Sequence, residues 1–320
     1  MVVMKSVSII IPVKAINDYI REAMQYYAEL DYDNYEILIF PDEESGETFP
    51  NARIIPSGPV GPADKRDMAL QYARGEIFAF IDDDAYPRKD WLKNAIHYFD
   101  DPEVGAVGGP AVTAPEDNVW QQASGKVYES FLCSGGFTYR YIPQAEREVV
   151  DLPSVNLIVR KDIFELIGGY DSNYYPGEDT KLCLDIVQKA GKKILYSPDI
   201  LVYHHRRSMF AGHLRQATNY AKHRGYFAKV LPETSRKLAY FIPSLFTLGL
   251  VLGPIVCAVF PVLWYVYGAV LAVYVILLIC SIRKPGAVSV WILTFCGIIA
   301  THIGYGICFI RGLCSRELLR

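Results

Sequence analysis

Residues 77–84 read IFAFIDDD, an apolar run that ends directly in three aspartates. An uninterrupted apolar run of this length is typical of a strand that is covered on both faces of a sheet. Residues 7–11, VSIII, form a second run of the same kind near the N-terminus. The two runs indicate a buried sheet, and the aspartates stand where one of its strands ends.

Strand-like and helix-like segments alternate on both sides of this stretch. Short apolar runs predict strands, and apolar residues at helical spacing predict helices. The expected strands are 7–11, 36–40, 53–56, 77–81, 154–160, 194–196 and 201–203, and the expected helices are 20–27, 64–74 closed by Gly75, 91–99, 162–167 and 178–190. This order predicts an α/β, Rossmann-like fold with a doubly wound, mostly parallel sheet. Ligands of such sheets bind beyond the carboxyl ends of the strands, where Asp42 and the Asp82 triplet are expected.

The C-terminal third has a different composition. Between Phe241 and Ile310 the only charged residues are Arg283 and Lys284. Three segments, 240–260, 262–282 and 287–310, reach the ~20 apolar residues that a membrane-spanning helix needs. We therefore divide the chain into a soluble α/β domain (1–207), an amphipathic segment (208–238) and an α-helical transmembrane bundle (239–320). The middle segment suits a helix lying in the membrane interface or a helix packed on the soluble domain.

The expected topology contains a conflict. If the soluble domain is cytosolic, the Arg283-Lys284 loop also lies inside, as the positive-inside rule prefers. Three full crossings then place Arg311, Arg316 and Arg320 outside, against the rule. Three crossings remain our expectation, and a re-entrant segment among the first two is the alternative.

Overall charge and cysteine spacing exclude some classes of protein. The chain has a formal net charge of −3, and its C-terminal part is net basic, so the soluble part is the more acidic. An acidic domain argues against a nucleic-acid partner. The seven cysteines include no CxxC pair, which fits a reducing compartment better than a disulfide scaffold.

Three short motifs carry side chains suited to chemistry. Asp82-Asp83-Asp84 offers carboxylates for a hard cation such as Mg²⁺ or Mn²⁺ and for a ribose, or else is an acidic turn. Gly177-Glu178-Asp179 begins a predicted helix, so its acids are either N-terminal helix residues favoured by the dipole or a general base. His204-His205-Arg206-Arg207 combines imidazoles and guanidiniums that suit a metal and a diphosphate.

Taken in order, these motifs resemble the family 2 glycosyltransferases with a GT-A fold, over roughly residues 5–230. The resemblance also includes Ser154-Val155-Asn156 and Ile167-Gly168-Gly169-Tyr170-Asp171. The membrane tail makes the chain similar to members that build cell-surface or exported polysaccharide. The resemblance implies an inverting transfer from a nucleotide-diphosphate sugar, with a UDP-sugar favoured, to a lipid-linked saccharide or glycolipid. It implies a multi-pass protein of the cell membrane, in contact with membrane lipids, whose catalytic domain is cytosolic. Between residues 111 and 150 the pattern of strands and helices weakens, which predicts a loop-rich insertion that shapes an acceptor site.

The resemblance also assigns roles to individual residues. It implies that Asp84, with Asp82 and His204, holds the divalent cation, and His205 is the alternative to His204. It also implies that Asp179, beside Glu178, is the catalytic base. The residues implied to bind the donor are Pro12, Asp42, Arg66, Asp82, Asp83, Arg206 and Arg207. Where Asp67 stands, the family often has asparagine.

Two alternatives remain open. A processive polysaccharide synthase would extrude its own polymer, but the Gln-x-x-Arg-Trp motif of such enzymes is at best partial here, where Gln216 is followed by ATNY. A non-catalytic membrane scaffold with a nucleotide-binding fold would retain Asp84, Asp179 and His204 only by coincidence. The sequence leaves the oligomeric state undetermined.

Overall fold

The computed structural model describes residues 4–282 and 286–318 and consists of two compact units. The first unit comprises Met1–Pro115 and Tyr139–His205, and the second comprises Glu116–Thr138 and Arg206–Arg320. The Arg283-Lys284 loop and Arg320, which entered the expected topology, lie outside the described residues.

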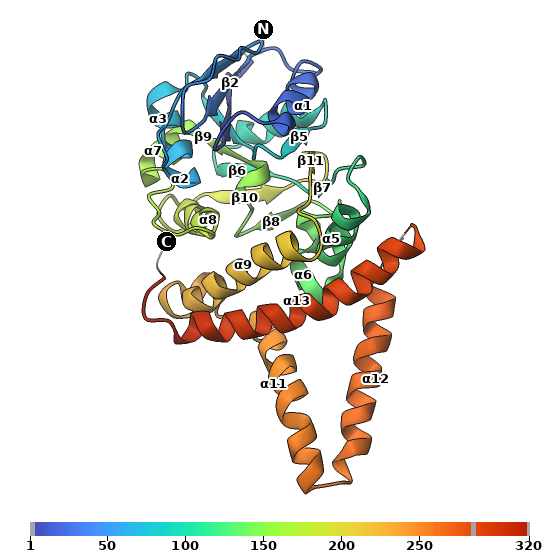
Figure 1. Cartoon of the computed structure of the whole chain (residues 1–320). Coiled ribbons are helices and arrows are strands. Elements are labelled where there is room, and N and C mark those ends of the chain that lie inside the picture. Colours follow the sequence, from blue (N-terminus) through green and yellow to red (C-terminus); the bar gives the residue numbers. More distant parts are fainter. Residues whose placement is uncertain (1–3, 283–285, 319–320) are drawn as a thin grey trace. The chain divides into compact units, whose positions relative to one another are not determined.

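The first unit is built on a large mixed sheet (Figure 1). Within the described residues, eight strands form this sheet in the order β3-β2-β1-β4-β9-β6-β10-β8. The strands are β1 (Val7–Pro12), β2 (Tyr35–Phe40), β3 (Ala52–Ile54), β4 (Ile77–Phe80), β6 (Val104–Gly108), β8 (Arg147–Val149), β9 (Leu157–Arg160) and β10 (Lys193–Tyr196). Strands β3, β2, β1 and β4 run parallel, as do β6 and β10, whereas β9 lies antiparallel between β4 and β6. The expected α/β fold with its central sheet is confirmed.

Helices cover both faces of this sheet, which explains the uninterrupted apolar runs. The helices of the first unit are α1 (Asp18–Tyr27), α2 (Pro62–Asp67), α3 (Ala69–Tyr72), α4 (Trp91–Ile96), α7 (Lys161–Ile167) and α8 (Glu178–Gln188). Alternate residues of β1 and β4, such as Ile9 and Ala79, pack in the core cluster with Ile20 of α1. On the opposite face of the sheet, the rings of Phe78 and Phe80 in β4 pack against Phe164 of α7.

The single helix expected over residues 64–74 is divided in two. Helix α2 ends at Asp67, and α3 ends at Tyr72 with Ala73 as its C-cap. The expectation that Gly75 closes this helix is therefore wrong. Gly75 instead allows two backbone segments to approach closely, because a Cβ there would lie 2.5 Å from the backbone nitrogen of Ser8. Gly168, by contrast, is the left-handed C-cap of α7, with φ of 81°.

A second, smaller sheet joins the ends of distant segments. Its strands are β5 (Ala85–Pro87), β7 (Ala111–Thr113) and β11 (Val202–His204), in the order β5-β11-β7. Strand β5 follows the aspartate triplet directly and pairs with β11, so that Ala85 is opposite His204. This pairing brings a motif from residue 204 beside one from residue 84.

A buried asparagine connects the strands around this junction. The Asn156 Oδ1 accepts a hydrogen bond from Trp91 Nε1 at 2.9 Å, and its Nδ2 donates to the carbonyl oxygens of Ile200 at 2.7 Å and Pro110 at 3.3 Å. Because the side chain is fully buried, each of these bonds replaces one that water would supply in the unfolded chain.

The second unit is helical. Its helices are α5 (Val119–Glu129), α6 (Phe131–Ser134), α9 (Ala211–Val230), α10 (Pro232–Ser235), α11 (Leu238–Val259), α12 (Leu263–Ser281) and α13 (Val288–Cys314). Helix α5 lies within residues 111–150, where the sequence pattern predicted a loop-rich insertion. Asn118 caps this helix by accepting hydrogen bonds from the backbone nitrogens of Trp120 and Gln121, which supplies a start signal that apolar spacing does not show.

Three helices in the described part of the chain, α11, α12 and α13, are long and apolar enough to span a membrane. Their bounds agree with the three expected spans to within a few residues at each end. Little of α11 and α12 is buried within the protein, whereas α13 has a larger buried share.

Gly109, between β6 and β7, gives the first testable prediction. A Cβ at this position would lie 1.9 Å from the Ile200 carbonyl oxygen, which already accepts from Asn156. Because backbone atoms cannot move aside, we expect Gly109→Ala to destabilise the protein by roughly 1–3 kcal/mol or more, measured by thermal unfolding in detergent. Gly46→Ala is the matched control, since nothing lies within 4 Å of its Cβ position. Equal melting temperatures for the two variants would contradict this packing.

Candidate active site

The carboxyl ends of β2, β1 and β4 lie next to one another, because these strands are parallel neighbours. Pro12 ends β1, Asp42 follows β2, and the triplet that begins at Asp82 follows β4. The expected strand-end positions are therefore brought to one edge of the sheet. His204 and the start of α8 belong to the same unit.

A buried lysine fixes the first part of this edge. The Lys65 Nζ donates to the carbonyl oxygen of Val13 at 2.5 Å and to that of Phe40 at 3.3 Å, and it forms an ion pair with the Asp42 carboxylate. The Asp42 side chain remains 18% exposed, so a ligand can still reach it. Lys65 thus joins the ends of β1 and β2 to Asp42.

Arg66, the next residue of α2, connects two of the predicted motifs. Its Nη2 lies 2.6 Å from Asp82 Oδ1, and its Nη1 lies 3.2 Å from Glu178 Oε1. The guanidinium is buried and faces the ring of Tyr170, with 5.4 Å from Cζ to the ring centroid. Burial alone would lower the pKa of Arg66, but Tyr170, Asp82 and Glu178 outweigh it and raise the pKa, so the group stays charged.

The three aspartates of the triplet have three different partners. Asp82 is paired with Arg66, and the Asp83 Oδ2 accepts from Asn17 Nδ2 at 2.6 Å. Asp84 faces His204, with 3.1 Å between Asp84 Oδ1 and His204 Nε2. Burial, and then the neighbouring Asp84 carboxylate, raise the pKa of Asp83 to about 6. Of the triplet, Asp84 is therefore the one directed at an imidazole.

The two neighbouring histidines have different environments. His204 is opposite Ala85 in the small sheet, which directs its Nε2 to Asp84. The His205 ring instead stacks on Tyr19, with 4.7 Å between centroids, and its Nε2 lies 3.2 Å from Glu22 Oε2. The His204 side chain thus contacts the aspartate triplet, and the His205 side chain contacts α1.

The two acids of the Gly177-Glu178-Asp179 motif also have different environments. Gly177, with φ of 117°, is the N-cap of α8, so both acids stand in the first helical turn. The buried Glu178 accepts from the Gly177 nitrogen at 3.0 Å and pairs with Arg66. Asp179 is half-buried, and its Oδ1 accepts from the backbone nitrogen of Thr180 at 2.7 Å. Glu178 therefore anchors the helix, and the more accessible Asp179 carries the second carboxylate.

Several residues that hold this site were not predicted. Tyr170 donates or accepts a hydrogen bond with Ser154 Oγ at 2.7 Å while its ring faces Arg66. Lys65 and Asn17 were also missed as partners of the strand-end acids. The signals available were weak: Lys65 adjoins Arg66, and Asn17 is recognisable only as the N-cap of α1, which accepts from the Ile20 nitrogen.

Two predicted donor-binding residues, Arg206 and Arg207, belong to the second unit. Arg206 is buried; its backbone nitrogen donates to Asp117 Oδ2 at 2.8 Å, and its guanidinium lies 5.8 Å from the ring centroid of Tyr128. Arg207 is exposed. Their expected contact with the donor stays a prediction.

Comparison with known structures shows the same fold elsewhere. A mannosyltransferase from Pyrobaculum calidifontis, solved in complex with GDP-Man and Mn²⁺, superposes with a TM-score of 0.63 at 21% sequence identity, covering 99% of this chain and 89% of that chain. The fold of the first unit is thus that of the GT-A glycosyltransferases, as expected.

Comparison of sequences identifies the family. The family model for Glycosyl transferase family 2 matches residues 8–168, which include the aspartate triplet and half of the chain. The chain therefore belongs to glycosyl transferase family 2 and is a glycosyltransferase.

Two curated relatives have informative names. The chain is 24% identical to dolichyl N-acetyl-alpha-D-glucosaminyl phosphate 3-beta-D-2,3-diacetamido-2,3-dideoxy-beta-D-glucuronosyltransferase of Methanococcus voltae, over 97% of this chain and 98% of that protein. It is 26% identical to glucosyl-dolichyl phosphate glucuronosyltransferase of Haloferax volcanii, over 43% of this chain and 46% of that protein.

Asp67 gives a prediction on pH dependence. Its carboxylate accepts from the backbone nitrogens of Tyr170 at 2.7 Å and Asp171 at 3.4 Å, and burial raises its pKa to about 6. The folded state therefore holds this proton up to about pH 6 while the unfolded chain releases it near pH 4, so stability falls as the pH rises through this window. Asparagine keeps an acceptor for Tyr170 and carries no charge.

We expect Asp67→Asn to raise the melting temperature, and to raise it more at pH 7.5 than at pH 5. The difference between the two pH values should correspond to about 1 kcal/mol, since each pKa unit is worth 1.36 kcal/mol. Asp162→Asn, at the exposed start of α7, is the control. A stabilisation by Asp67→Asn that is equal at both pH values would show that this carboxyl titrates normally.

Proposed function

We propose that this enzyme transfers a sugar, with inversion, from a nucleotide-diphosphate donor to a lipid-linked saccharide. The observation that carries the proposal is the bridge made by Arg66, which ties the donor-side Asp82 to Glu178, the neighbour of Asp179. A UDP-sugar is the favoured donor, with Pro12 and Asp42 beside the base and with Asp82 and Asp83 near the ribose.

The residues present fit a divalent cation, Mn²⁺ or Mg²⁺, beside the donor diphosphate. Asp84 and His204 offer a carboxylate oxygen and an imidazole nitrogen 3.1 Å apart, and Asp82 is already paired with Arg66. No group of three or more His, Cys, Asp or Glu side chains with metal-site geometry occurs in the described ranges, 4–282 and 286–318. Two protein ligands leave positions for phosphate oxygens and water, which is the usual arrangement for such ions. When bound, the cation would neutralise charge on the departing diphosphate.

Asp179 is the proposed general base. The acceptor hydroxyl attacks the anomeric carbon of the donor, the bond from that carbon to the diphosphate oxygen breaks, and the hydroxyl proton passes to Asp179. A single displacement inverts the anomeric configuration. Glu178 positions Asp179 through the first turn of α8, because its own carboxylate is held by Arg66 and by the Gly177 nitrogen.

A lipid-linked acceptor is supported by the membrane helices and by the relatives. Both relatives named above act, by their names, on dolichyl-phosphate-linked sugars. A chain anchored in the bilayer meets a lipid-borne acceptor at high effective concentration. Arg207 and Arg215 are exposed in the second unit and suit an anionic lipid phosphate or diphosphate. The enzyme is then a multi-pass protein of the cell membrane that adds sugar on the cytosolic face.

The metal assignment predicts a loss of donor turnover in Asp84→Ala. The diphosphate would lose its bridge to the protein, so metal-dependent nucleotide binding should weaken as well. His204→Ala should reduce metal dependence while leaving the melting temperature near that of the wild type. Asp18→Ala is the control, because that acid is almost fully exposed. Full turnover by Asp84→Ala in the presence of a chelator would contradict the assignment.

The base assignment predicts that Asp179→Asn binds donor normally but transfers slowly. The variant keeps the side-chain shape and loses the proton acceptor, so transfer should fall by roughly 10²–10⁴-fold. Glu165→Gln, an exposed acid on α7, should have no effect. Nucleotide affinity and single-turnover transfer rates separate the two effects, and a normal transfer rate in Asp179→Asn would mean that another group is the base.

The acceptor class is tested by giving the purified enzyme its donor with a lipid-linked saccharide or with the same saccharide lacking lipid. We expect transfer to the lipid-linked form alone, of one sugar per acceptor, and a reduced rate when Arg207 and Arg215 are both changed to Gln. Equal transfer to both acceptors would contradict the proposed acceptor, and long products would favour a processive synthase. If the donor is consumed with neither acceptor, the result would favour a non-catalytic scaffold.

A further inference from the structure

Helix α13 crosses the open end of the hairpin that α11 and α12 form (Figure 1). Length and composition make α13 a candidate for a third crossing. A third crossing helix would lie alongside the other two, with contacts spread along their length. The contacts within the second unit show a different arrangement.

Helix α11 contacts α13 through its first turns. Ser244 Oγ donates to the Gly306 carbonyl oxygen at 3.0 Å, and the rings of Phe241 and Phe309 meet edge to face, with 4.8 Å between centroids. Thr247 Oγ1 and the Phe246 ring also contact α13, at His302, and both belong to the first three turns of α11.

Helix α12 contacts α13 through its last turns. Tyr274 Oη lies 2.9 Å from His302 Nδ1, and Leu278 packs in one apolar cluster with Ile298. The start of α11 and the end of α12 are the two ends of the hairpin farthest from its turn at Phe260. Helix α13 therefore meets the hairpin where it opens.

The opposite side of α13 is occupied by a polar helix along half of its length. The Nε2 of His213 in α9 lies 2.9 Å from Thr301 Oγ1. Farther along, a Cβ on Gly225 would lie 2.1 Å from the Phe309 carbonyl oxygen, and a Cβ on Gly312 would lie 1.9 Å from that of Lys222. These glycines allow the two backbones to touch, so α9 follows α13 from Thr301 to Gly312.

The first half of α13 is covered in the same way by α5. A Cβ on Gly297 would lie 2.9 Å from Val127 Cγ2. Next to Val127, Lys126 forms an ion pair with Glu129 at 2.7 Å. Charged or polar helices therefore lie against α13 over both halves.

A crossing by α13 would carry these partners into the hydrocarbon layer. Helix α9 includes Arg215, Lys222, Arg224 and Lys229, and each charge at the centre of a bilayer costs at least ~2.5 kcal/mol. The hairpin can cross the bilayer without this cost, because α11 and α12 contain no charged residue.

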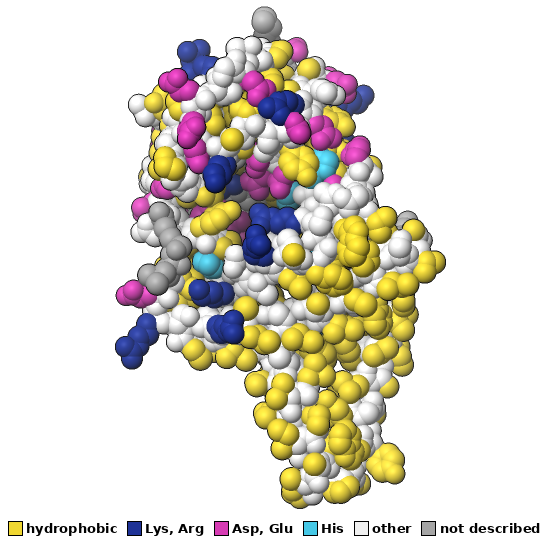
Figure 2. Space-filling view, viewed as in Figure 1, with side chains coloured by type: hydrophobic (Ala, Val, Ile, Leu, Met, Phe, Trp, Pro, Cys, Tyr) yellow, Lys and Arg dark blue, Asp and Glu magenta, His cyan; other side chains and the backbone are white. Residues whose placement is uncertain are grey.

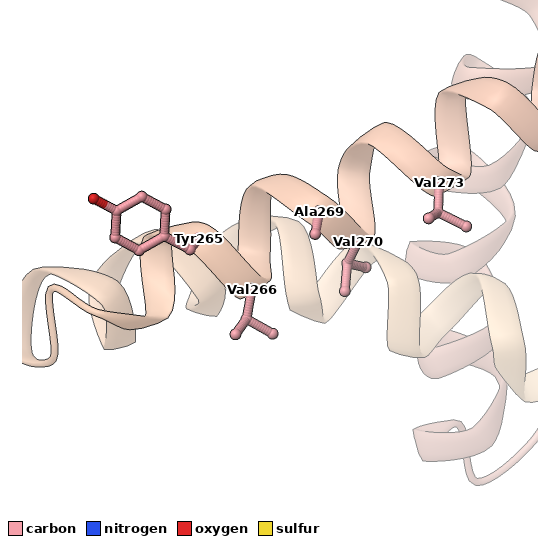
Figure 3. A pocket seen from close by; sticks show the side chains of 5 residues that line it. All are labelled: Tyr265, Val266, Ala269, Val270 and Val273. Carbon is pink, nitrogen blue, oxygen red and sulfur yellow. The ribbon is translucent and has the colours of Figure 1, made fainter.

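The hairpin exposes apolar side chains along both of its helices. Figure 2 shows hydrophobic side chains over α11 and α12, and the groove in Figure 3 is lined by Tyr265, Val266, Ala269, Val270 and Val273 of α12. Val262 at the turn is 71% exposed and Tyr265 is 83% exposed. Apolar residues exposed around the whole helix are what lipid chains contact.

We infer that α11 and α12 cross the bilayer as a two-helix hairpin and that α13 lies in the membrane surface, with its lipid side toward the hairpin and its other side against α9 and α5. The chain then crosses the membrane twice, and Cys314 lies on the same side as the start of α11. The inference rests on the proposed membrane location and is independent of the proposed chemistry.

This arrangement removes the charge conflict in the sequence. Arg311 and Arg316 stand at the end of α13, on the side where Arg236 and Lys237 precede α11. Lys229 of α9 donates to the Ser315 carbonyl oxygen, which fixes the end of α13 beside α9. His302, near the middle of α13, lies at headgroup depth with the Leu132 carbonyl oxygen 3.0 Å from its Nε2, instead of at the centre of the bilayer.

The test is cysteine labelling of the full-length chain with a membrane-impermeant maleimide. Val262→Cys places a thiol at the exposed turn of the hairpin, and Cys314 is a native exposed thiol at the end of α13. Cys314→Ser identifies the label that belongs to that residue. Labelling is compared in intact cells and in inside-out vesicles, and the melting temperature of each variant in detergent verifies that it folds.

We expect the thiol of Val262→Cys to be labelled only from outside and Cys314 only in inside-out vesicles. Labelling of both from outside would mean three crossings and would overturn the inference. Failure to label Val262→Cys from outside would mean that the hairpin does not cross, which also overturns it. Loss of transfer activity has no bearing on these outcomes, so failure of the proposed chemistry remains distinguishable.

Discussion

The buried guanidinium of Arg66 is the interaction on which the site depends. It joins Asp82 after β4 to Glu178 at the start of α8, two residues that are nearly a hundred positions apart in the sequence. Removing one partner of a buried ion pair typically costs 3–5 kcal/mol, because the other charge is left uncompensated. The stacked ring of Tyr170 and the adjacent Lys65, which ties β1 to β2, extend this support to the neighbouring strands.

The bridge separates the acids of each motif into supporting and accessible members. Asp82 and Glu178 face Arg66, and this leaves Asp84 directed at His204 and Asp179 more accessible at the helix start. In each motif, an acid that supports the site thus stands close to an acid that is available to a ligand. Backbone geometry decides which of the two faces Arg66. In the second unit, Gly225 and Gly312 allow the backbones of α9 and α13 to touch, and this contact fixes the two helices against each other.

Much of the fold and the position of the site could be predicted from local patterns. Apolar runs followed by acids located the strand ends. The family resemblance assigned roles to His204 and Asp179, and these roles stay predictions. The partners of these residues could not be predicted, because contacts such as Asn17 with Asp83 join positions far apart in the sequence. Helix α5 was missed because polar residues and a glycine interrupt its apolar ones. The direction of α13 could not be predicted, because hydropathy reports the length of a segment and not its orientation.

The bridge is tested most directly by a double-mutant cycle of Arg66→Met and Glu178→Gln, with unfolding free energy and transfer rate as readouts. Arg66→Met should be destabilised by about 3–5 kcal/mol, since it leaves the buried Glu178 without its charge partner. Glu178→Gln should be destabilised by less, because Arg66 keeps its ion pair with Asp82. The double variant should be less destabilised than the sum of the two by roughly 0.5–3 kcal/mol, the range for residues in contact. Additive losses in stability, or a normal transfer rate in Arg66→Met, would contradict the account that Arg66 holds the two halves of the site together.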